Sequence, residues 1–253
     1  MAKVISISNQ KGGVGKTTTT SALAAGLKKR GYRVLAIDLD PQGNLGFSIG
    51  ADTETGASIY NVLKGEVKIQ YAIQKTDSMD IIISSILLSG IDLEFTNTGR
   101  EFLLKEAIQP ILESYDYIFV DTPPALGILT INAFTASDFI IVPMLSDIFS
   151  LQGIAQLYET VERVKKYCNP NLSIAGILLT RFTPRTRLSR EVRGTAELIA
   201  KDLQLCVFDS YIRSSVSAGE AQSLQQNVFD YDARSHVAED YSHFIDELLA
   251  KGV

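Results

Sequence analysis

The chain has 253 residues, of which 45% are hydrophobic and 21% are charged, and its formal net charge is −5. This composition is typical of a globular protein with a substantial core. The sequence has no run of about 18 apolar residues that would predict a transmembrane span, and its first residues do not resemble a secretory signal. The acidic balance argues against DNA binding over the whole surface. The two histidines leave little room for His-based catalysis or metal binding. The two cysteines are far apart and lack metal-ligand spacing, so we expect them to be reduced in a cytoplasmic protein.

Short apolar segments alternate with helical patterns along the chain, which indicates repeated βαβ units. Runs rich in Ile and Val predict strands at 3–8, 33–38, 79–84, 117–121, 139–143 and 173–180. Helical patterns occupy 15–31, 100–114, 151–167, 188–203 and 236–250. We therefore predict an α/β fold with a mostly parallel, twisted sheet and helices on both faces, in a single domain over 1–253.

The first predicted strand leads directly into a glycine-rich turn, SNQKGGVGKTTTT at 8–20, and then into a helix. This is the context of a P-loop, in which backbone amides and a helix N-terminus bind phosphate. Lys16 is expected to contact the β- and γ-phosphates, and the Thr17 hydroxyl to hold Mg²⁺. The usual spacing has a glycine where this chain has Gln10, and an additional lysine, Lys11, follows it. The predicted nucleotide-binding residues are Lys11, Gly12, Gly13, Val14, Gly15, Lys16, Thr17 and Thr18.

Three aspartates follow predicted strands at the edge where such sheets bind ligands. Asp38 ends the second strand, Asp40 lies just beyond it in DLDPQGN, and Asp121 ends the strand YIFVD. Asp121 fits the magnesium-supporting aspartate of a P-loop enzyme. Any one of them could instead be a turn or helix-cap residue, but three at one edge favour a catalytic centre.

The segments KGGVGKTTT, DLDPQGN and DTPPALGILTINAFTASD resemble the ParA/Soj family of DNA-partitioning ATPases, within the deviant Walker-A class that includes MinD. The resemblance implies an ATP- and Mg²⁺-dependent ATPase that alternates between ATP and ADP states and forms a nucleotide-sandwich homodimer. It implies that Lys11 reaches the partner's ATP, that Asp40 orients the attacking water, and that Asp38 supports the loop and the Mg²⁺ shell. It also implies a ParB-type centromere-binding partner and association with the nucleoid. The implied catalytic residues are Lys11, Lys16 and Asp40, and the implied metal residues are Thr17, Asp38 and Asp121.

The densest basic stretch runs from 181 to 193, where five arginines face a single glutamate. Arginines bind DNA phosphates without reading sequence, although Arg193, Glu197 and Lys201 are spaced to pair along one helix instead. The family resemblance favours DNA binding, but Ser217 and Gln222 stand where relatives often have arginine and proline. The predicted DNA-binding residues are Arg185, Arg187, Arg190, Arg193 and Arg213.

Three other functions on this fold are weaker. A MinD-like membrane regulator needs a basic amphipathic C-terminal helix, whereas 236–250 carries mainly acidic polar residues and is expected to pack on the core. Metal-cluster and reductase relatives need paired cysteines in a suitable motif, which Cys168 and Cys206 do not provide. Small-molecule ligases would need a substrate motif that we do not find.

Overall fold

The computed structural model describes the backbone of residues 1–253 and the side chains of all but positions 148, 149 and 152. Its strands form one eight-stranded sheet in the order β3-β4-β2-β5-β1-β6-β7-β8. Every neighbouring pair is parallel except β3 and β4, which are antiparallel. The mostly parallel α/β fold is therefore confirmed. The strands are β1 (Lys3–Ile7), β2 (Val34–Asp38), β3 (Gln74–Lys75), β4 (Asp80–Ile82), β5 (Tyr117–Asp121), β6 (Phe139–Leu145), β7 (Ser173–Phe182) and β8 (Val207–Arg213).

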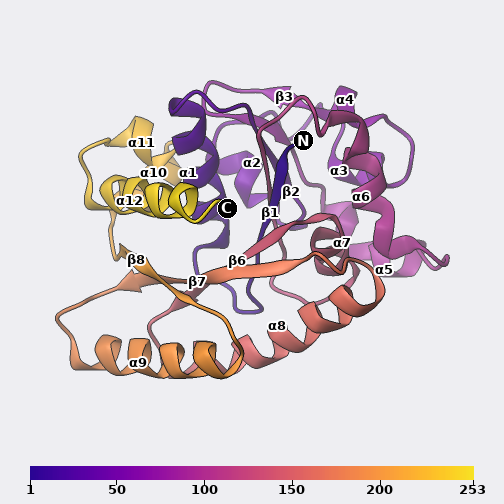
Figure 1. The fold of residues 1–253 in the computed structure, drawn as a ribbon. Coiled ribbons are helices and arrows are strands. Elements are labelled where there is room, and N and C mark those ends of the chain that lie inside the picture. Colours follow the sequence, from indigo (N-terminus) through magenta and orange to yellow (C-terminus); the bar gives the residue numbers. More distant parts are fainter.

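Helices cover both faces of this sheet (Figure 1). One face is covered by α1 (Lys16–Lys29), α2 (Asn44–Ser48), α10 (Ser217–Ser223), α11 (Val228–Tyr231) and α12 (His236–Ala250). The other is covered by α3 (Ile59–Leu63), α4 (Ile69–Ala72), α5 (Ile91–Glu94), α6 (Leu103–Ile108), α7 (Ile128–Ala136), α8 (Ile148–Tyr167) and α9 (Arg187–Asp202). The 3₁₀ turns η1 (Ile86–Gly90), η2 (Arg100–Phe102) and η3 (Gln109–Ile111) lie in the connection between β4 and β5.

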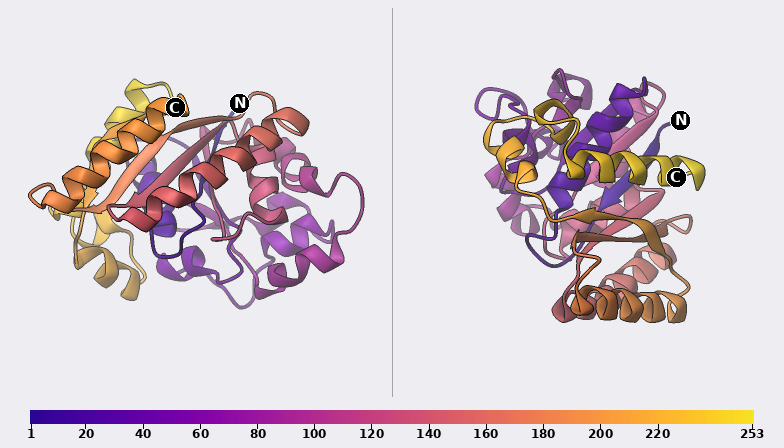
Figure 2. Two further views of the ribbon diagram at one scale, coloured as in Figure 1. Left: turned by 90° about the horizontal axis from the view of Figure 1, so that it is seen from below. Right: turned by 90° about the vertical axis from the view of Figure 1, so that its left-hand side faces the viewer.

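The central strands are buried on both faces, which explains their continuous apolar sequences. All five residues of β5 are buried. Successive side chains of a strand point to opposite faces, so Ile118 and Val120 join the core under α7 and α8, while Phe119 joins the core under α1 and α12. The turned views in Figure 2 show the sheet enclosed between these two helical layers.

The structure departs from the predicted elements in ways that have physical causes. The sequence analysis missed β8, an edge strand with a mixture of exposed and buried residues rather than a continuous apolar run. It also missed α7, whose sequence ILTINAFTA is apolar on nearly every side and lacks a helical period. The helix expected over 100–114 is divided into η2, α6 and η3, and Pro110, which has no backbone N–H to donate, lies in η3.

The topology gathers the polar ends of the central strands at one place. β1 lies between β5 and β6. The chain runs from β1 to β2 on one side of β1, and later passes from β5 across β1 to β6 on the other side. Open α/β sheets bind ligands at such a point, outside the carboxyl ends of the strands. In this chain the glycine-rich loop follows β1 at that point.

Candidate nucleotide site

The loop between β1 and α1 has the backbone conformation that a phosphate-binding loop needs. Gly13 and Gly15 adopt positive φ angles of 72° and 89°, in the left-handed region that glycine enters without a steric penalty. Gly15 occupies the N-cap position of α1, and the first turn of α1 contains no acidic side chain. The positive end of the helix dipole is therefore not offset by a carboxylate within that turn and can attract an anion.

Neighbouring strands hold this loop in place. The Thr180 hydroxyl, on β7, donates to the carbonyl of Val14 at 2.8 Å. The Asn9 side-chain amide donates to the carbonyl of Pro143, on β6, at 2.7 Å, and its oxygen accepts from the Lys11 N–H at 2.9 Å. The loop is thus fastened to two strands before any ligand binds, which lowers the entropy lost on binding.

Two buried aspartates lie side by side behind the loop. Asp38 and Asp121 are register partners at the ends of β2 and β5. Burial is the main cause that raises the pKa of both carboxyls, to about 7 for Asp121 and well above the usual range for Asp38, where the neighbouring Asp121 adds to the effect. The Thr17 hydroxyl donates to Asp121 Oδ2 at 2.7 Å, which favours the charged form and opposes part of the rise in the pKa of Asp121.

Asp38 and Asp40, which lie close together after β2, have different surroundings. Asp38 accepts backbone N–H groups from Asp40 and Leu45, each at 3.1 Å, and so fixes the turn that follows β2. Asp40 is only partly buried and lines a cavity of 560 Å³ together with Gly12, Lys16 and Thr17. Asp38 thereby holds the turn after β2, and Asp40 borders the cavity itself.

The cavity suits the phosphate end of a nucleotide with one divalent cation. Burial lowers the pKa of the Lys16 ammonium group, although the nearby Asp121 and Asp40 oppose that effect. Among the described side chains, no three carboxylate, His or Cys groups form a metal cage. Mg²⁺ commonly uses one or two protein groups and completes its shell with water and substrate phosphate, so Thr17 with Asp121 behind it fits this ion.

Lys11 is at the mouth of the loop but is not among the residues that line the 560 Å³ cavity. Its ammonium group lies 2.8 Å from Asp147 Oδ2 and 3.3 Å from the Ser150 hydroxyl. Asp147 is the N-cap of α8 and also accepts the Ser150 N–H at 2.9 Å. Lys11 is therefore directed toward α8 and not into the cavity beside the glycine-rich loop of its own chain.

A second cavity, of 330 Å³, adjoins the first and has a mainly apolar lining that includes Ile212, Val216 and Val237. Both cavities share Arg181 and Gln222, and the Gln222 amide donates to the Thr18 hydroxyl at 2.9 Å. The sequence analysis did not assign either residue to the site. The only sequence feature that pointed to this part of the site was Gln222, which stands where relatives often have proline.

The five arginines predicted to bind DNA differ in how they are engaged. Arg187 pairs with Glu191 at 2.6 Å and Arg193 with Glu197 at 2.8 Å, both along α9. Among the described residues, the guanidinium groups of Arg185 and Arg190 make no hydrogen bond or ion pair, and both residues are exposed. Arg193 thus forms part of the helix pairing that was the alternative explanation of this stretch.

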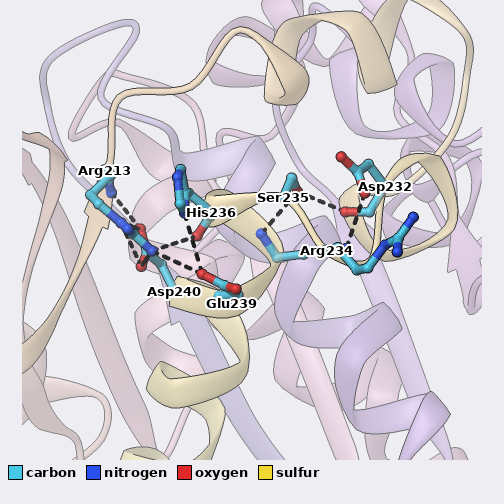
Figure 3. Close-up of polar contacts among 8 residues, drawn as sticks. Arg213, Asp232, Arg234, Ser235, His236, Glu239 and Asp240 are labelled. Carbon is cyan, nitrogen blue, oxygen red and sulfur yellow. Dashed lines mark hydrogen bonds and ion pairs between the residues drawn. The ribbon is translucent and has the colours of Figure 1, made fainter.

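Arg213 lies away from α9, at the end of β8. Its guanidinium contacts Asp240 at 2.6 Å and Glu239 at 3.3 Å (Figure 3). Asp240 is largely buried, whereas Glu239 is half-exposed and also meets the His236 ring at 3.3 Å. The role of Arg213 in DNA binding stays a prediction, and it would require this arginine to exchange carboxylate partners for phosphate.

The loop geometry, the paired aspartates and the sheet order define a P-loop nucleotide-binding ATPase fold. Comparison with known proteins agrees, because an AAA domain family model matches residues 2–174. The chain is 40% identical over 256 residues to the sporulation initiation inhibitor protein Soj of Bacillus subtilis, covering 100% of both chains. It is 37% identical to the chromosome partitioning protein ParA of Myxococcus xanthus, covering 99% of this chain and 89% of that one.

Among solved structures, cobyrinic acid a,c-diamide synthase from Mycobacterium smegmatis with bound ADP and magnesium superposes with a TM-score of 0.87 at 34% identity, covering 100% of this chain and 96% of that one. The full-length identity to Soj and ParA shows that the chain belongs to the ParA/Soj family of partitioning ATPases. The predicted family is confirmed. Separately, the described residues include no helix of sufficient length and apolar character to cross a membrane.

Proposed function

We propose that this protein is an ATP-dependent DNA-segregation ATPase whose ATP-bound homodimer binds DNA without sequence preference and leaves it after hydrolysis. The observation that carries this proposal is the direction of Lys11, which lies at the loop mouth but contacts Asp147 instead of lining its own phosphate cavity. A lysine in this position is available to a nucleotide on a second copy once the contact with Asp147 is exchanged.

In this proposal the triphosphate occupies the 560 Å³ cavity and the base occupies the adjoining 330 Å³ cavity. The backbone amides of Gly13 and Gly15 and the Lys16 ammonium group bind the phosphates. Thr17 and Asp121, with Asp38 behind the loop, would hold Mg²⁺, which when bound neutralises phosphate charge. Asp40 lies at the cavity edge, where its carboxylate can orient a water for attack on the γ-phosphate.

Hydrolysis and dimerisation are coupled in this arrangement. Phosphoryl transfer depends mainly on positioning and on neutralising the charge that develops in the transition state. A lysine from the partner supplies positive charge only while the dimer exists, so a monomer retains nucleotide but hydrolyses it slowly. The family resemblance supports a ParB-type centromere-binding protein as the partner that accelerates this step, and association with the nucleoid through DNA.

The proposed DNA contact is the arginine group at the start of α9, with Arg185 and Arg190 as its first members. Both are exposed, and neither has a partner among the described side chains. Arg187 and Arg193 can contribute after exchanging Glu191 and Glu197, because ion pairs four residues apart along a helix surface contribute only about 0.3–0.5 kcal/mol.

The alternative of a membrane-bound spatial regulator has less support. It would require the apolar face of α12 to meet lipid, whereas Tyr241, Phe244 and Leu248 are buried in the core against α1 and β8. The similarity to cobyrinic acid a,c-diamide synthase shows the fold that both chains share. An activity of that kind would need a substrate motif that the sequence does not contain.

Replacing Lys11 tests the proposal. Lys11→Ala should abolish ATP-dependent dimerisation and hydrolysis, because the trans contact is lost, while ATP binding stays measurable. The measurements are light scattering with ATP or ADP, phosphate release, and calorimetric ATP binding, with the exposed Lys75→Ala as the control. Normal ATP-induced dimers in the Lys11 variant would refute the proposed role of the lysine.

A further inference from the structure

Arg181, the next-to-last residue of β7, has an unusual backbone conformation at the boundary of the two cavities. Its φ is +48°, in the left-handed region that arginine rarely enters. Such conformations are retained where the surrounding structure demands them, and they cluster at ligand sites. Gln204 and Gln225 are the other described non-glycine residues with positive φ, and neither is on the lining of either nucleotide cavity.

The phosphate loop itself restrains the backbone at this position. Thr180, the preceding residue, donates its hydroxyl to the Val14 carbonyl at 2.8 Å and to the Met144 carbonyl at 3.2 Å. The Thr180 side chain also faces Gly15, since a Cβ built on that glycine would lie 3.8 Å from the Thr180 methyl carbon. Arg181 therefore emerges at a position determined by the loop, next to where a nucleotide would lie.

The side chain of Arg181 has the chemistry to cover a base. It is exposed, it lines both cavities, and no hydrogen bond or ion pair is found for it among the described side chains, unlike Arg187, Arg193 and Arg213. A guanidinium is planar and weakly hydrated, and it stacks favourably on aromatic rings. The 330 Å³ cavity below it has the apolar lining that a base requires.

We propose that Arg181 is a nucleotide-binding residue whose guanidinium lies over the base in the 330 Å³ cavity, and that it is not part of the DNA surface formed by the neighbouring arginines. The inference rests on the proposed function, because it assumes that this cavity holds the base. It adds a base contact that the glycine-rich loop does not supply. It also explains why a strained arginine occupies this position.

The test compares ADP with tripolyphosphate, which has phosphates but no base. Arg181→Asn suits the left-handed backbone and removes the guanidinium. It should weaken ADP binding by a factor of about 2 to 30, the range expected for loss of a cation–π contact, and leave tripolyphosphate binding unchanged. Arg181→Gly should give the same result, which would separate loss of the side chain from a change in loop flexibility. Arg163→Ala, at an exposed arginine of α8 that lines neither cavity, is the matched control and should keep the wild-type affinity for both probes.

Calorimetry at equal Mg²⁺ concentration measures both affinities, and thermal unfolding checks that the variants are folded. An Arg181→Asn protein that binds ADP as tightly as the wild type would overturn the inference, as would an equal loss for ADP and tripolyphosphate. Failure of the wild-type protein to bind ADP would instead refute the proposed function, so the two failures can be told apart.

Discussion

The side chain of Asp147 has two roles that a conservative substitution can separate. It caps α8 through the Ser150 N–H, and it holds the Lys11 ammonium group at 2.8 Å. Asparagine is as good an N-cap as aspartate but carries no charge. Asp147→Asn should therefore remove the ionic part of the contact with Lys11 while keeping the helix intact.

We expect Asp147→Asn to form ATP-dependent dimers at a protein concentration about 1.4- to fivefold lower than the wild type requires. The pair is one-third exposed, with side-chain accessibilities of 36% and 32%, and breaking such a pair costs about 0.2–1 kcal/mol. Sedimentation with ATP across a dilution series measures the shift. Glu162→Gln, which removes another lysine-paired carboxylate of α8, is the control, and an equal shift in it would count against the model.

Asp40 is the carboxylate of the cluster that borders the phosphate cavity, while Asp38 is occupied with backbone amides. Asp40→Ala should bind ATP and form dimers but hydrolyse ATP at least about a hundredfold more slowly, because the attacking water is no longer oriented. Single-turnover phosphate release measures this. The exposed Asp77→Ala is the control, and near-normal turnover in Asp40→Ala would remove Asp40 from the mechanism.

At the scale of elements, α9 and the turn before it carry the proposed DNA surface. Arg185→Glu combined with Arg190→Glu changes two exposed arginines without breaking a described ion pair. We expect ATP-dependent DNA affinity to fall and the slope of log K against log salt to decrease by about 2, since each lost phosphate contact removes about 0.9. Fluorescence anisotropy with random-sequence DNA over a salt series measures both values.

The matched control for this pair lies on α8, the helix that precedes β7. Arg163→Glu combined with Lys166→Glu changes the net charge by the same amount, also at exposed positions. Wild-type DNA binding in this control would assign the effect to α9 and not to net charge. An unchanged salt slope in the α9 variant would move the DNA surface to another element.

At the scale of the whole molecule, nucleotide binding should stabilise the fold, because the site joins loops from both halves of the sheet. A ligand at about 100 times its dissociation constant adds about 2.7 kcal/mol to the free energy of unfolding. For a protein of this size that corresponds to a rise in Tm of about 5–10 °C. We expect this shift with ADP and Mg²⁺, and a smaller one with ADP and a chelator. Thermal unfolding of Lys16→Ala is the control, and a full shift in it would place the stabilising site elsewhere.

Local chemistry in the sequence was sufficient to predict the central sheet, the phosphate loop and the family. The strands β1, β2, β5, β6 and β7 are apolar runs because both of their faces are buried, and that pattern is legible without coordinates. The GKT segment and its glycines specify a phosphate loop because few other residues tolerate its left-handed turns. By contrast β8, half-exposed at the sheet edge, and α7, apolar on nearly every side, lack the periodic signal on which such prediction depends.

What only the tertiary structure decided is which side chains meet. The sequence contains Lys11 and Asp147 as residues 136 positions apart, and nothing local indicates that they form an ion pair. It contains a run of arginines, and folding divides them into two that pair along α9, two whose side chains have no described partner, and Arg181 on the lining of the 560 Å³ cavity. The reason is physical: backbone conformation follows from short-range sterics and burial pattern, whereas the partner of a charged side chain depends on where separate strands and helices bring distant residues together.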